Sequence, residues 1–292
     1  MDSLSKPSVV QNSRKTLPTL ARECGGGGRI VLEGLANTRD LGGIETADGR
    51  CVKSHRLIRS GALTKATKSD LQVLLGEYRV KKVIDFRTRE EQIESPDPRK
   101  SMVGVSFVGI PIFDARSIGI TRERGIKGFL EALVELKQDP AALMTEAYSA
   151  ILMEEKCRQG YARFFDELLA LEENAVLWHC SAGKDRAGLA TVLVLSALGT
   201  SRDVIVADYL ETNHYLRAST ESIERLLDAY PIPDEVKASF RVLNSTDVRF
   251  LDAALAPVEK AYGGLSEYLR EALGVTDEKK EALRQRYLMK VR

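Results

Sequence analysis

The stretch His179-Cys180-Ser181-Ala182-Gly183-Lys184-Asp185-Arg186-Ala187-Gly188 joins an apolar run that ends at Trp178 to a helical pattern that begins near Arg186. A strand, a short loop and a helix in this order leave the N–H groups of the loop without intrahelical partners, at the positive end of the helix dipole. Such a loop binds phosphate. The predicted phosphate-binding residues are Ser181, Ala182, Gly183, Lys184, Asp185 and Arg186.

Two side chains of this loop have the chemistry for attack on phosphorus. Unpaired N–H groups and a nearby cation favour the thiolate form of a cysteine, and the thiolate is the nucleophile. We therefore predict that Cys180 is the nucleophile. Arg186 follows six residues later, and its planar guanidinium can hold two equatorial phosphoryl oxygens through the transition state.

His-Cys-x5-Arg with a trailing glycine resembles the signature of the cysteine-dependent protein tyrosine and dual-specificity phosphatases. The interior residues 182–186 are similar to the bacterial and fungal tyrosine and phosphoinositide phosphatases of that superfamily. Further blocks resemble the same family, and together they span roughly residues 30 to 290. These blocks are residues 37–43 with 48–50 and 57–61, residues 83–90, and residues 262–275.

The resemblance implies hydrolysis of phosphate monoesters through a phosphocysteine intermediate, with no metal and no organic cofactor. It implies a phosphorylated protein, a phosphoinositide or a small phosphorylated molecule as substrate. The family usually has Ser or Thr directly after the arginine, to assist hydrolysis of the intermediate, whereas this chain has Ala187. Loss of one transition-state hydrogen bond slows a step by about 10- to 1,000-fold. We therefore expect hydrolysis of the phosphocysteine intermediate, rather than attack by the thiolate, to be the slowed step.

Composition limits the other possibilities. The 292 residues carry a formal net charge of +1 and are 43% hydrophobic, which predicts a sizeable core and gives no indication of a nucleic-acid partner. No apolar run approaches the roughly 18 residues of a transmembrane helix, and no secretory signal is apparent. Scattered cysteines without C-x-x-C spacing, and only three histidines, predict no metal site. We expect a cytoplasmic protein with reduced cysteines.

The pattern along the chain predicts an α/β fold with a parallel-rich central sheet flanked by helices. Residues 1–28 are expected to form a flexible arm, and residues 29–292 a single catalytic domain. Within it, the pattern predicts a helical insertion over residues 115–172, which forms a lid or wall, and a helical C-terminal region over residues 200–292. Strands are predicted at 29–33, 56–60, 80–86, 106–112 and 175–179. Helices are predicted at 67–76, 126–137, 140–155, 159–171 and 186–198, and after residue 199 at 202–215, 220–228, 233–241, 247–262, 266–272 and 277–290.

The general acid is the least determined role, and aspartates are the candidates. Asp185 resembles the placement seen in some phosphoinositide phosphatases whose loop ends in Asp-Arg, and it is the first choice. Asp85, at the carboxyl end of a predicted parallel strand, is the second, and Asp114 is the third. A structural ion pair of Asp85 with Arg87 and Glu90 is the alternative for that cluster.

Other residues are expected to support the loop. His179 should face the opposite side of its strand from Cys180 and orient the loop. Lys184 either adds positive charge at the mouth of the site or is a solvated loop lysine. Arg39 and Asp40, followed by two glycines, predict a tight turn beside the loop that either touches substrate or buttresses the loop.

Phosphatase activity is the leading hypothesis. The alternative raised by Ala187 is a phosphate-binding pseudophosphatase, or a slow-turnover trap. A third possibility is an enzyme of specialised metabolism on the same fold.

Overall fold

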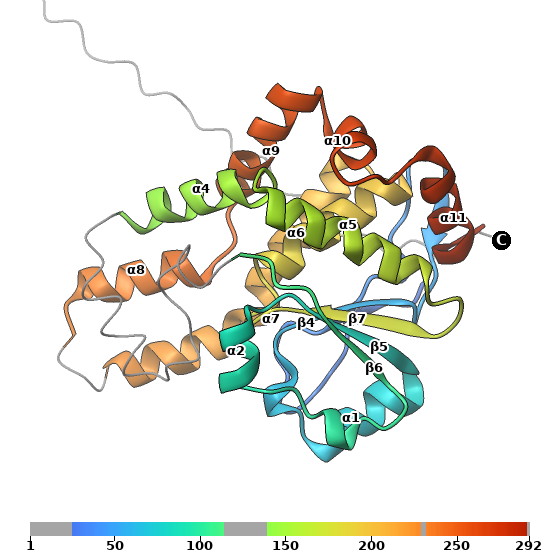
Figure 1. The fold of residues 1–292 in the computed structure, drawn as a ribbon. Coiled ribbons are helices and arrows are strands. Elements are labelled where there is room, and N and C mark those ends of the chain that lie inside the picture. Colours follow the sequence, from blue (N-terminus) through green and yellow to red (C-terminus); the bar gives the residue numbers. More distant parts are fainter. Residues whose placement is uncertain (1–24, 114–138, 229–231, 291–292) are drawn as a thin grey trace, which may run out of the picture.

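A six-stranded sheet forms the centre of the fold, with the strand order β1-β2-β4-β7-β5-β6 (Figure 1). The computed structural model describes residues 25–113, 139–228 and 232–290. Strands β4, β7, β5 and β6 run parallel, whereas β1 and β2 add an antiparallel edge. The bounds are β1 Gly28–Arg29, β2 Arg39–Asp40, β4 Leu57–Ser60, β5 Val80–Asp85, β6 Ser106–Gly109 and β7 Ala175–His179.

The central strand β7 is buried along its whole length, and its side chains alternate between two hydrophobic clusters. Val176 and Trp178 belong to the larger cluster, and Ala175 and Leu177 belong to the smaller one. Alternation of this kind is expected of a strand covered on both faces. The strand that leads into the loop at residues 180–185 is therefore packed against hydrophobic residues on both faces.

Helices cover both faces of the sheet, as expected for a parallel-rich sheet (Figure 1). Helices α5, α6, α9, α10 and α11 lie over one face, and α1 lies on the other. Capping boxes begin α1 at Thr67 and α2 at Thr88. The bounds are α1 Lys68–Gln72, α2 Arg89–Glu94, α4 Pro140–Ile151, α5 Glu155–Leu169, α6 Arg186–Leu198, α7 Arg202–Asp228, α8 Asp234–Asn244, α9 Val248–Tyr262, α10 Leu265–Glu271 and α11 Asp277–Tyr287.

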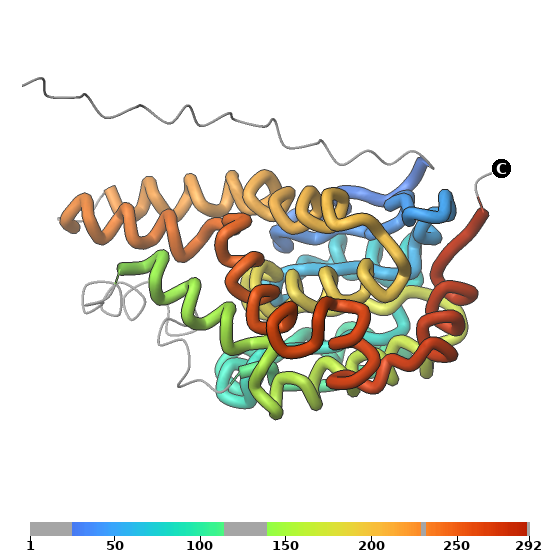
Figure 2. Tube along the Cα trace, turned by 90° about the horizontal axis from the view of Figure 1, so that it is seen from above, coloured from blue at the N-terminus to red at the C-terminus, as the bar shows by residue number. Residues whose placement is uncertain are grey.

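Helices α4, α7 and α8 extend together beyond one end of the sheet (Figure 2). At the opposite end a second, two-stranded sheet pairs β3 (Arg50–Val52) with β8 (Leu288–Lys290). Lys53, the residue after β3, adds to the contacts between these two parts of the chain. Its Nζ donates to the carbonyl oxygens of Gln285 at 3.0 Å and Arg286 at 2.8 Å. In the described residues no helix is both long and apolar enough to cross a lipid bilayer.

The predicted α/β class, with a parallel-rich sheet between helices, is confirmed. The predicted strand 29–33 is wrong beyond Arg29, because the N–H groups of Glu33 and Gly34 bond the Asp70 carboxylate at 2.7 and 2.9 Å. The predicted helices 202–215 and 220–228 form one helix, α7, since no Gly or Pro interrupts them. The predicted helix over 277–290 ends at Tyr287, where β8 begins.

Part of the predicted organisation lies outside the described residues, namely 1–24 of the expected arm and 115–138 of the expected insertion. Residues 140–151 and 155–169 of that insertion form α4 and α5. Cys157 and Cys180 are free thiols, whereas Cys51 is disulfide-bonded. The expectation that every cysteine is reduced is therefore wrong at Cys51.

Candidate active site

The loop between β7 and α6 has the shape of a phosphate cradle. It requires glycine at Gly183, where φ is +68° and a Cβ would lie 2.3 Å from the carbonyl oxygen of Ser60. The N–H groups of residues 181 to 185 have no hydrogen-bond acceptor among the described residues. These groups are therefore available to a bound oxyanion at the start of α6.

The carbonyl oxygens of the loop, in contrast, are bonded by donors from distant parts of the chain. These donors fix the backbone from outside the cradle. They are Ala62 N to Ser181 O at 3.0 Å, Asn37 Nδ2 to Ala182 O at 3.0 Å, Arg59 Nη2 to Gly183 O at 2.7 Å, and Tyr161 OH to Arg186 O at 3.1 Å. The loop is thereby held in one conformation before any ligand binds, which is preorganisation.

Cys180 and Arg186, the predicted nucleophile and phosphate ligand, lie on this loop as expected. Cys180 is 2% exposed. The Arg186 guanidinium binds Glu91 of α2 with two hydrogen bonds, Nη1 to Oε2 at 2.6 Å and Nη2 to Oε1 at 2.9 Å. Ser181 Oγ also donates to Glu91 Oε1, at 2.6 Å. Glu91 therefore links the side chains of Arg186 and Ser181 through hydrogen bonds.

The pKa values of this pair reflect their mutual attraction. Burial alone would raise the pKa of Glu91, but the hydrogen bonds and the charge of Arg186 lower it from 4.5 to about 2. Burial opposes the charge on Arg186, yet Glu91 and the nearby Cys180 raise the pKa of the guanidinium. Both partners remain ionised at neutral pH.

Sequence reasoning missed Glu91. The signal was present, because Thr88 and Glu91 form a capping box that fixes the start of α2: Glu91 N donates to Thr88 Oγ1 at 3.2 Å, and Thr88 N to Glu91 Oε2 at 2.6 Å. The pattern locates the helix start, but it does not indicate that the same carboxylate reaches Arg186.

Asp185, the first candidate for the general acid, lies at the N-cap of α6 with no capping bond. Its Oδ1 accepts from Tyr148 OH at 2.5 Å and from Lys184 Nζ at 2.6 Å. Lys184 is only 2% exposed and also donates to Ser245 O at 3.2 Å. Lys184 is therefore neither a solvated loop lysine nor a free charge at the mouth.

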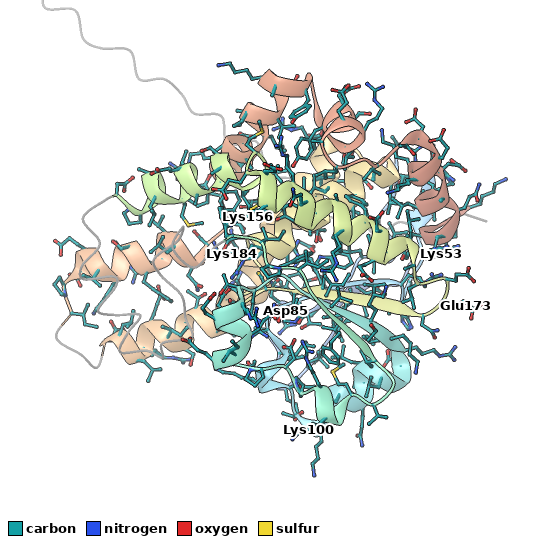
Figure 3. The ribbon with its side chains drawn as sticks, in the orientation of Figure 1. Lys53, Asp85, Lys100, Lys156, Glu173 and Lys184 are labelled. Carbon is teal, nitrogen blue, oxygen red and sulfur yellow. The ribbon has the colours of Figure 1, made fainter. Side chains whose placement is uncertain are left out.

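Asp85 lies in a separate buried network with Arg87, Asp97 and His179. Arg87 Nη2 donates to Asp85 Oδ2 at 2.8 Å and to Asp97 Oδ1 at 3.0 Å, and His179 Nε2 lies 3.1 Å from Asp97 Oδ2. The ion pair of Asp85 with Arg87 is thus present, while Glu90 is exposed. Figure 3 shows Asp85 and Lys184 toward one end of the sheet, with Glu173 at the other.

Asp85, Asp97 and His179 bring one potential metal-ligand atom each within 4.8 Å of one another. The guanidinium of Arg87 already supplies a positive charge to both carboxylates. Burial opposes protonation of His179, but the two carboxylates raise its pKa. The donor set is therefore better suited to a cationic side chain than to an added metal ion.

Arg39 and Asp40 are both fully buried and bonded to neighbouring parts of the fold. Arg39 Nε binds Asp208 Oδ1 of α7 at 3.0 Å, and Arg59 Nη1 binds the other oxygen at 2.9 Å. Asp40 instead accepts from the N–H groups of Gly42 and residue 55, so it shapes the tight turn. Asp114, the third candidate for the general acid, lies outside the described residues.

A cavity of about 530 Å³ adjoins the phosphate loop. Ser181 and Ala182 of the loop, Gly61 after β4 and Tyr215 of α7 contribute to its lining. It lies where the parallel strands end, which is the usual ligand position of open α/β sheets.

Comparison with known proteins agrees with this geometry. Residues 30–289 match the profile of the tyrosine phosphatase family. The chain belongs to this family. It is 31% identical over 252 residues to a Cupriavidus necator protein whose name assigns it provisionally as a tyrosine-protein phosphatase, covering 84% of each chain.

Two further relatives match over a similar length of this chain. The triple specificity protein phosphatase PtpB of Mycobacterium tuberculosis is 29% identical over 264 residues, which are 82% of this chain and 92% of that one. A tyrosine-protein phosphatase of Nostoc commune is 25% identical over 244 residues, or 80% and 75% of the two chains.

Proposed function

We propose that this phosphatase hydrolyses phosphate monoesters through a phosphocysteine intermediate on Cys180. The observation that carries the proposal is the buried Cys180 in a loop whose free N–H groups and Arg186 together make an oxyanion site. The thiolate attacks phosphorus, the P–O bond to the leaving group breaks, and Asp185 protonates the departing oxygen. Water then attacks phosphorus with Asp185 as base, and the S–P bond breaks to release phosphate and the thiolate.

The test is phosphate release from p-nitrophenyl phosphate. Wild-type protein should turn over and be inhibited by vanadate, and Cys180→Ser should abolish turnover. Cys157→Ser is the matched control, because Cys157 is a free buried thiol as well, the second one in the part of the chain that the structure describes, and lies on α5. Absence of turnover in the wild type, or its survival in Cys180→Ser, contradicts the proposal.

The substrate class proposed is a phosphorylated protein, with phosphoinositides and small phosphorylated molecules as competitors. The names of the relatives refer to tyrosine and, in one case, to triple specificity. Phosphopeptides carrying phosphotyrosine, phosphoserine or phosphothreonine, assayed beside a phosphoinositide, distinguish these classes by kcat/KM.

A slow-turnover trap is the second candidate function, and Ala187 is the observation that favours it. Ala187 is fully buried, and its carbonyl oxygen accepts from Trp178 Nε1 at 3.2 Å and Thr191 Oγ1 at 2.8 Å. Its side chain offers no hydroxyl to the departing sulfur. Ala187→Thr should raise the steady-state rate about 10- to 1,000-fold and remove any initial burst of nitrophenolate. An unchanged rate with no burst in the wild type would contradict the trap.

A further inference from the structure

We propose that Tyr148 of α4 is a positioning residue for the acid Asp185, holding Oδ1 so that Oδ2 carries the proton to the leaving group. This inference rests on the proposed function. Oδ1 accepts two short hydrogen bonds, from Tyr148 OH at 2.5 Å and Lys184 Nζ at 2.6 Å. Oδ2 accepts none from the described residues. A proton on this carboxyl therefore resides on Oδ2, the oxygen left for the substrate.

The Tyr148 hydroxyl is itself fixed. Tyr148 is 2% exposed, and its oxygen accepts from Tyr209 OH at 3.0 Å. Its ring meets that of Tyr209 edge-on and lies 5.9 Å from that of Phe250. Burial, with Asp185 beside it, raises the pKa of Tyr148. The hydroxyl therefore keeps its proton and donates a hydrogen bond to Oδ1.

Tyr148 is hydrogen-bonded to the proposed general acid and not to the proposed phosphate ligand. Tyr148 contacts Asp185 and Tyr209 through hydrogen bonds, but the phosphate ligand Arg186 is held by Glu91 instead. Loss of the Tyr148 hydroxyl should therefore impair protonation of the leaving group more than phosphate capture. The effect depends on the leaving group, because nitrophenolate departs readily without a proton whereas phenolate and alkoxides require one.

The experiment compares kcat/KM for p-nitrophenyl phosphate and phenyl phosphate in wild type and Tyr148→Phe. With phenyl phosphate we expect a loss of about 10- to 100-fold, which is part of the roughly 100- to 10,000-fold that a well-positioned general acid contributes. With p-nitrophenyl phosphate we expect a loss under about 3-fold. Tyr287→Phe is the control, since it removes a buried tyrosine hydroxyl that donates to Leu168 O at 2.7 Å and has no bond to Asp185 or Tyr148. It should lose under about 3-fold with either ester.

Two further variants make the test decisive. Asp185→Asn should show the same leaving-group selectivity with a larger loss, and adding Tyr148→Phe to it should cause no further loss. Lys184→Met removes the other donor to Oδ1 and should reproduce the selectivity even if Tyr148→Phe does not fold.

Equal losses on both esters, or no loss on either, overturn the positioning role of Tyr148. Absence of selectivity in Asp185→Asn overturns the acid assignment. In contrast, a wild type that releases no phosphate overturns the proposed function itself, so the two failures are distinguishable.

Discussion

Replacement of Glu91 by Gln tests the coupling between α2 and the phosphate loop most directly. The pKa of Glu91 falls from 4.5 to about 2 on folding, which corresponds to about 3 kcal/mol of stability at neutral pH. Removal of one partner of a buried ion pair costs about 3–5 kcal/mol, so the two routes agree. Glu91→Gln should therefore lower Tm by roughly 6 to 12 °C at pH 7.

The pH dependence follows from the same depressed pKa. The contribution of Glu91 to stability is complete above its unfolded pKa of 4.5 and is lost as pH falls through its folded pKa of about 2. Urea unfolding at pH 7 and at steps between pH 5 and 2 measures the free energy of unfolding of wild type and variant. The difference between the two free energies should shrink as the pH falls across that window.

Glu90→Gln is the matched control, because Glu90 lies in the first turn of the same helix but is exposed. Its effect should stay within about 0.5 kcal/mol. A gap below about 1 kcal/mol for Glu91→Gln at pH 7, or a gap independent of pH, would refute the reasoning.

Three further changes address the supporting structure. Gly183→Ala brings a Cβ to 2.3 Å from Ser60 O at positive φ, so it should cost more than about 1 kcal/mol in urea unfolding and reduce vanadate affinity; a neutral outcome would show that the loop can relax. Asp208→Asn leaves two buried arginines without their anion and should cost about 3–5 kcal/mol, checked by the same unfolding. His179 has a raised pKa, so its stabilisation is complete below its unfolded pKa of 6.5 and is lost as pH rises through the folded value. Asp97→Asn should reduce that pH dependence, with Asp85 still opposite the ring, and an unchanged unfolding profile would contradict the ion pair.

The elements that sequence predicts well are those determined by short-range pattern. The strand over 175–179 and the helix over 186–198 match β7 and α6, because an apolar run and a glycine at 199 mark their ends. The position of Cys180 and Arg186 on the loop between these two elements could be predicted for the same reason, since the residue types stand within one short stretch. Their roles as nucleophile and phosphate ligand stay predictions, as do those of the acid and the supporting residues.

The partners of the loop could not be predicted, because they depend on how distant elements dock. Glu91 reaches Arg186 from 95 positions away, and Tyr148 reaches Asp185 from 37. Their identity depends on how α2 and α4 are rotated and shifted against the sheet, which no local periodicity encodes. The predicted helix over 277–290 failed in its last three residues for a related reason, since β8 exists only because β3 is there to pair with it.

The pairing of β3 with β8 has a consequence for biosynthesis. During synthesis β3 leaves the ribosome long before β8, because the two strands are far apart in the sequence. Lys53, for example, is 233 residues from Arg286, whose carbonyl oxygen accepts its hydrogen bond. Until then the edge of β3 has unpaired backbone groups, which are a template for non-native pairing with other chains. Nascent chains stalled before β8 should therefore be the species most in need of chaperones.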